Sequence, residues 1–116
     1  MRRPLLLLAL LSACSTPAEK NRKAMEALCP RVETMVCDET IVNVNPADRA
    51  TIIASRLSDL DPAYATLFAG IAPIPVKDKL PWMTSTVSKA LGHPWSCPAW
   101  EATWQGRDAC AEQKGK

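Results

Sequence analysis

The sequence is poor in histidine, glycine and aromatic residues other than tryptophan. Its 116 residues include one His, four Gly, one Phe and one Tyr. There is no glycine-rich phosphate loop, no internal repeat and no Cys-x-x-Cys or His-x-x-x-His spacing. Structural zinc sites, redox-active dithiols and covalent haem sites rely on such close pairs. The sequence therefore argues against these classes, and we expect no cofactor and no dedicated metal site.

The chain also lacks a net charge outside its first residues. Fourteen Lys and Arg stand against twelve Asp and Glu, and Arg2 and Arg3 account for the whole excess. A balanced surface without a basic run gives no long-range attraction to nucleic acid or to anionic lipid. We therefore expect no nucleic-acid partner.

Long hydrophobic runs are missing as well. The longest, from Leu5 to Leu11, has seven residues, whereas a transmembrane helix needs about 20. It follows two arginines and precedes small residues, which is typical of a secretory signal. The tetrapeptide Leu11-Ser12-Ala13-Cys14 resembles the lipobox of bacterial lipoproteins. An ordinary signal peptide with a cysteine near the cut is the alternative.

The lipobox resemblance implies a diacylglyceryl group on Cys14, cleavage before that residue, and attachment of the protein to a membrane. Two or more acyl chains make a stable anchor. Ser15, in place of Asp, implies delivery to the outer membrane where the cell has two membranes. We therefore expect a chain anchored by lipid in the cell membrane or outer membrane, facing the periplasm or the exterior.

The length remaining after cleavage is enough for one domain. We expect a signal peptide over 1–13, the lipidated cysteine and a polar tether over 14–23, and a helical domain over 24–113. The polar residues 15–23 could equally form the first turns of a helix. The domain resembles small uncharacterised lipoproteins with an early cysteine, several helices and a late Gly-x-x-x-x-Cys-Pro, here Gly92 to Pro98.

Four cysteines remain after Cys14, and an even number in an exported domain predicts two disulfides. Three pairings are possible. Cross-links between the early and the late pair would close loops of about 60 to 80 residues and constrain the unfolded chain most. Local pairs would have to span too long a stretch of one helix, unless Pro30 breaks it. The disulfide candidates are Cys29, Cys37, Cys97 and Cys110.

The fold class predicted is all-α, a small bundle of four to five short helices. Apolar residues at spacings of three and four begin at Met25, and that helix should restart or kink at Pro30 and run towards Ile41. Further helices are expected over 46–59 (inward face Ile52, Ile53, Leu57 and Leu60), from Pro62 with Gly70 as the closing residue, from Lys79 or Pro81 to Leu91, and from Pro98 to Cys110. Residues 72–75 should be an extended connector over the core, and 41–44 a possible short strand.

The segment from Gly92 to Trp104 holds the only His and three of the four Trp, so it is the first candidate for a binding site. Tryptophans that complete a small core are the alternative, above all for Trp100 and Trp104. One histidine without a nearby acid or nucleophile is not a catalytic arrangement, so no enzyme is expected. The candidate binding residues are Trp82, His93, Trp95, Trp100 and Trp104.

Together these features predict a non-enzymatic envelope lipoprotein that binds or scaffolds an envelope protein or ligand. The alternative is a periplasmic carrier of a ligand or metal that uses the Gly92–Trp104 segment and the cysteines.

Overall fold

The computed structural model describes residues 16–115, and there the chain is all-α, as predicted. Two short helices, α3 and α8, bring the number in the described residues to seven. The helices are α2 (Pro17–Met35), α3 (Glu39–Val42), α4 (Pro46–Leu60), α5 (Pro62–Ile71), α6 (Val76–Leu91), α7 (Pro98–Trp104) and α8 (Ala109–Lys114).

Helix starts follow local capping signals. Asn45 accepts a hydrogen bond from the Ala47 amide at 3.1 Å, and Asp61 accepts one from the Ala63 amide at 2.8 Å. In both cases proline follows as the first helical residue, where its missing N–H is not needed. Gly92 ends α6 with a φ of 80°, a left-handed conformation that favours glycine. The sequence predicted all three signals.

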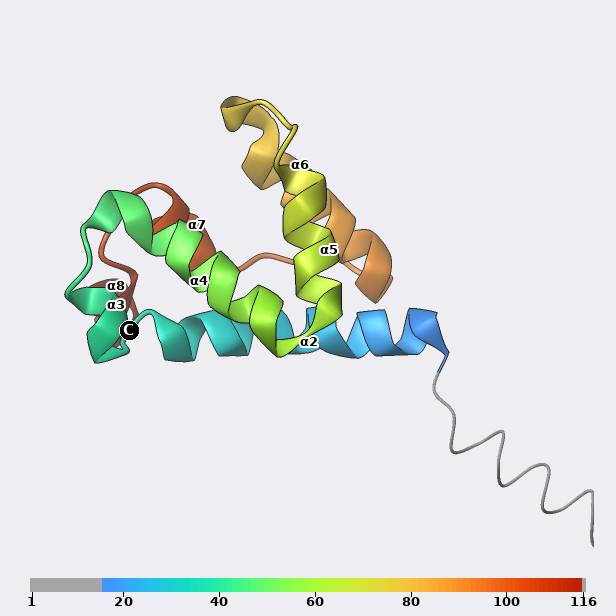
Figure 1. The fold of residues 1–116 in the computed structure, drawn as a ribbon, viewed down its shortest axis with the longest axis horizontal. Helices are drawn as coiled ribbons and strands as arrows, with labels where there is room; N and C mark the ends of the chain where they lie inside the picture. Colours follow the sequence, from blue (N-terminus) through green and yellow to red (C-terminus); the bar gives the residue numbers. More distant parts are fainter. Residues whose placement is uncertain (1–15, 116) are drawn as a thin grey trace, which may run out of the picture.

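Helix α2 is the longest helix described, at 19 residues, and α5, α6, α7 and α8 all contact it. Figure 1 shows α2 along one side of the molecule, with α3 and α8 at the end opposite Pro17. Its apolar face joins those of the other helices in one core. The largest fully buried side chains of that core are Trp100, Tyr64, Leu28, Ile41, Ile53, Leu57, Met83, Val32, Val87 and Cys97.

The structure excludes a restart at Pro30, which was one of two alternatives there, and the prediction that the first helix runs towards Ile41 was wrong. The helix continues through Pro30 instead of restarting there, and it ends at Met35. Proline has no N–H to donate to the carbonyl one turn earlier in the helix. Pro30 lies on the exposed side of α2, where water can donate to that carbonyl instead. Residues 39–42 form α3 and not a strand, because Asp38 caps a new helix by accepting from the Thr40 amide at 2.9 Å.

Three further expectations need correction. The last helix divides into α7 and α8, because Gly106, with a φ of 76°, ends the first part and Asp108 caps the second. Leu60 is 59% exposed, because α4 ends there and no further turn carries the apolar stripe over the core. Residues 72–75 form a turn in which the Ile74 amide donates to the Ile71 carbonyl, and α6 begins directly after it.

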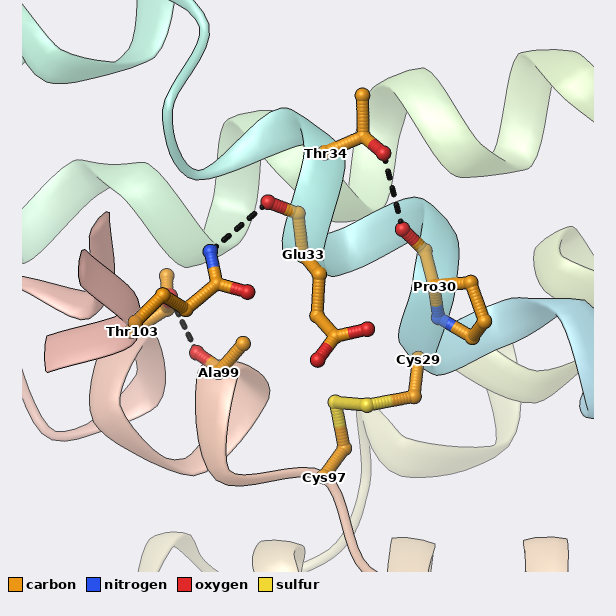
Figure 2. The surroundings of a disulfide bond; sticks show 8 residues. Cys29, Pro30, Glu33, Thr34, Cys97, Ala99 and Thr103 are labelled. Atoms are coloured by element: carbon orange, nitrogen blue, oxygen red, sulfur yellow. Dashed lines mark hydrogen bonds between the residues drawn. A yellow bond between two sulfur atoms is a disulfide. The ribbon is translucent and has the colours of Figure 1, made fainter. Parts of the chain in front are cut away.

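Two disulfides join α2 and the segment after it to the end of the chain. They link Cys29 to Cys97 and Cys37 to Cys110, with Cα–Cα distances of 5.6 and 4.9 Å. Sequence separations of 68 and 73 residues confirm the favoured cross-links between the early and late cysteines. Figure 2 shows the first of them, between the middle of α2 and the residue that precedes α7.

The lipobox residues and Cys14 lie outside the described residues. Residues 17–23 form the first turns of α2, which was one of the two alternatives for the polar segment. Over residues 16–115, no helix combines the length and apolarity needed to cross a bilayer.

Candidate functional site

The candidate tryptophans do not gather in one place. Trp100 is 1% exposed, with its ring 5.6 Å from that of Phe68 and 6.1 Å from that of Trp104. Its indole N–H has no hydrogen-bond partner among residues 16–115. Trp104 is half-buried against the same core. Trp100 is therefore a core residue, whereas Trp104 is only partly buried against the core.

His93 and Trp95 lie in the turn between α6 and α7. His93 is exposed, and its Nδ1 lies 3.0 Å from the carbonyl of Pro94. Trp95 is half-buried, and its amide donates to the Ser88 hydroxyl at 2.9 Å. These contacts shape the turn, and neither residue lines a hollow described below.

The four candidate cysteines are all joined in disulfides. Only a thiolate binds metal or acts as a nucleophile, so these four cysteines offer no ligand while they are oxidised. Among residues 16–115, no three His, Cys, Asp or Glu side chains are grouped closely enough to hold a metal ion.

Trp82 lines a hollow between α2, α5 and α6 that none of the other three tryptophans lines. The hollow has a volume of about 300 Å³. Trp82 is half-buried there and packs against α5 at Gly70, where an added Cβ would lie 2.8 Å from the ring atom Cη2. The hollow is lined by Asn21, Met25, Ala63, Thr66, Leu67, Trp82, Thr86 and Ala90.

A second, larger groove of about 690 Å³ opens between the first four turns of α2, from Pro17 to Arg31, and the start of α5. Its lining includes three cationic side chains, from Lys20, Lys23 and Arg31, and one carboxylate, from Asp61. That carboxylate already caps α5. The remaining lining residues are Pro17, Asn21, Ala24, Pro62, Ala63 and Thr66.

Tyr64 links α5 to α2, the two helices that form this groove. It is fully buried, and its hydroxyl donates to the Ala24 carbonyl of α2. The Arg31 guanidinium donates to the same hydroxyl at 3.2 Å and lies 5.5 Å from the ring centre. Burial raises the pKa of Tyr64 above its ordinary value of 10.0, so the hydroxyl stays protonated.

Sequence reasoning missed the cationic residues of this groove because Lys20 and Lys23 stood in a segment interpreted as a tether or as the first turns of a helix, apart from Arg31 in the predicted helical domain. A signal was present in their spacing. Lys20 and Lys23 are three apart, and Arg31 follows Lys20 by eleven residues, which is about three helical turns. Once the segment is taken as helix, that spacing places the three residues on one side of it.

The chain matches no family model, and comparisons with curated proteins and with solved structures found no similar protein.

Proposed function

We propose that this protein is a lipid-anchored lipoprotein of the cell envelope whose helical domain binds another envelope component and catalyses no reaction. The anchor rests on the residue pattern: a basic start, a seven-residue apolar run, and Leu11-Ser12-Ala13-Cys14. The two disulfides are consistent with an oxidising compartment.

The observation that carries the binding function is the place of the larger groove. Pro17 lies in its wall, only three residues after Cys14. Three residues span at most about 11 Å, so a lipid on Cys14 would hold the groove close to the bilayer surface. A binding site in that position would meet membrane components first.

The chemistry of the groove favours binding over catalysis. Its lining offers ammonium and guanidinium groups, amide and hydroxyl groups and apolar side chains. Its carboxylate, Asp61, is engaged as a helix cap. Binding sites combine an apolar lining with a few polar groups in this way.

The anchor is tested by the intact mass of membrane-extracted protein, without reductant, before and after thiol alkylation. We expect a chain that begins at acylated Cys14, lacks four hydrogens and takes up no alkylating agent. An unmodified Cys14 would refute the lipoprotein assignment. Free thiols on an acylated chain would restore the metal-carrier alternative.

Binding is tested by placing a photocrosslinking residue in the groove of the protein in living cells. Thr66 lines both hollows, whereas Thr51 is an exposed threonine on α4 that lines neither. We expect crosslinks to one membrane or periplasmic component from position 66 and not from position 51. Equal capture at both positions would contradict a binding function at the groove.

A further inference from the structure

The two hollows adjoin. Asn21, Ala63 and Thr66 line both of them, so the groove at the start of α2 continues towards Trp82 on α6. Volumes of about 690 and 300 Å³ lie within the range of small-molecule sites. The combined groove therefore has two ends of different chemistry.

The larger hollow, which begins at Pro17, is cationic. Lys20 and Lys23 are exposed, and within residues 16–115 no carboxylate lies within 4.0 Å of their ammonium groups or of the Arg31 guanidinium. Arg31 instead contacts the neutral Tyr64 hydroxyl. The chain is balanced in formal charge outside its leader, yet here three cations face one carboxylate. This end is complementary to an anion.

The other end is apolar. Met25 and Leu67 form its floor with exposed fractions of 2% and 5%, and Trp82 and Ala90 are half-buried. Its polar additions are the Asn21 amide and the hydroxyls of Thr66 and Thr86, and none of them carries a charge. An alkyl chain would gain free energy here by leaving water, whereas a second anionic group would not.

We infer that the groove binds a single-chain anionic amphiphile of the fatty-acid or alkyl-phosphate class. Its head lies at Lys20 and Lys23, with Arg31 as a further cation in the lining of the same hollow, and its chain extends towards Trp82. The inference rests on the proposed function in one respect, because the adjacent membrane supplies the ligand. An acidic peptide would match the lysines and leave the apolar end unfilled.

The test uses the full chain in vesicles of zwitterionic phosphatidylcholine. Three photoreactive probes share one diazirine-bearing alkyl chain and differ in the head, which is a carboxylate, a phosphate or a neutral alcohol. Labelling is mapped by mass spectrometry and normalised to labelling of the vesicle lipid. We expect label on α6 near Trp82 and Thr86, about tenfold stronger for an anionic probe than for the alcohol, a ratio that equals about 1.4 kcal/mol.

Two matched pairs of variants test the two ends separately. Lys20→Gln with Lys23→Gln should lower anionic labelling about tenfold, whereas Lys77→Gln with Lys89→Gln, exposed lysines of α6 outside both hollows, should leave it unchanged. Thr86→Phe should block the apolar end, and Ser85→Phe, the exposed neighbour outside the hollow, should not. If Thr86→Phe fails to fold, the surface lysine pair still decides.

Each outcome has one meaning. Stronger labelling by the carboxylate or by the phosphate supports the inference and names the source of the head group. Equal labelling by the alcohol, or no effect of the lysine pair, overturns it. Protection of the groove by a second copy or by a protein also overturns it. A chain found without lipid on Cys14 is probed in buffer, so the ligand and the anchor are judged separately.

Discussion

The Tyr64 hydroxyl on α5 donates a hydrogen bond to the carbonyl of Ala24 on α2, forty residues earlier in the chain. This bond joins α5 to α2 at Ala24, which is one of the residues that line the cationic groove. Tyr64 is the single tyrosine of the sequence, so its ionisation can be followed without interference.

Tyr64 should make the stability of the protein depend on alkaline pH. Its pKa is raised in the folded protein by burial, so the folded state keeps a proton that the unfolded state loses above about pH 10. The stabilisation is complete below pH 10 and is lost as the pH rises through the folded pKa. Ultraviolet titration of tyrosinate, with urea unfolding across this range, measures both effects.

The matched variant is Tyr64→Phe. It removes the hydrogen bond to Ala24 and should cost about 1 kcal/mol at neutral pH. The part of the alkaline loss of stability that comes from Tyr64 should then be absent, so the unfolding free energy of the variant should fall less above about pH 10. An identical alkaline loss in Tyr64→Phe would show that another group is responsible.

The two disulfides should differ in their resistance to reductant. Cys37 is exposed, whereas Cys97 is only 2% exposed. A limiting amount of reductant should therefore open Cys37–Cys110 first, as shown by alkylation and peptide mass mapping. Replacing either pair with alanine should cost about 4 kcal/mol in the chain-entropy model, less any strain. Earlier opening of Cys29–Cys97 would contradict this order.

Trp100 and Trp104 should differ strongly in their contribution to stability. Trp100→Ala removes a side chain that is 1% exposed and should lower the free energy of unfolding by about 3 to 5 kcal/mol. Trp100→Phe should cost less, because it also removes an indole N–H that has no partner. Trp104→Ala, on a half-buried residue, serves as the comparison in urea unfolding. An equal loss at both positions would argue against this packing.

Gly70 should be coupled to Trp82. An alanine Cβ at position 70 would lie 2.8 Å from Cη2 and 3.2 Å from Cζ2 of the indole, so the ring must move. Crowding of about 1 to 3 kcal/mol should outweigh the helix preference for alanine of about 0.5 to 1 kcal/mol. A double-mutant cycle with Trp82→Phe measures the coupling. Stabilisation by Gly70→Ala with Trp82 in place would refute the contact.

Much of the fold follows from local signals that act within a few residues. The pairs Asn45-Pro46 and Asp61-Pro62 mark helix starts, and Gly92 marks a stop, because capping and the φ of glycine act locally. The restart expected as one alternative at Pro30 does not occur, because whether an exposed helix turn tolerates proline depends on solvent reaching the carbonyl that proline leaves without a partner. Leu60 was wrongly expected to face the core, because the spacing of apolar residues does not show where the neighbouring helix lies.

The candidate site, like the fold, could be predicted from the sequence only in part. The sequence singled out Trp82, but it placed Lys20 and Lys23 in a tether and could not join them to Arg31, Asp61 and α6. Helix periodicity determines which residues share a face. Which faces meet, and where they leave a hollow, depends on packing between helices that are distant in sequence.

The amino-acid sequence by itself determined the all-α class, the capped helix starts and the even set of four cysteines, because these depend on propensities and counts that need no partner. Only the tertiary structure decided that Cys29 meets Cys97, that Trp100 is buried, and that Lys20 and Trp82 line adjoining hollows. The physical reason is that such contacts form between elements brought together by burial of a shared core, and their energies depend on that arrangement.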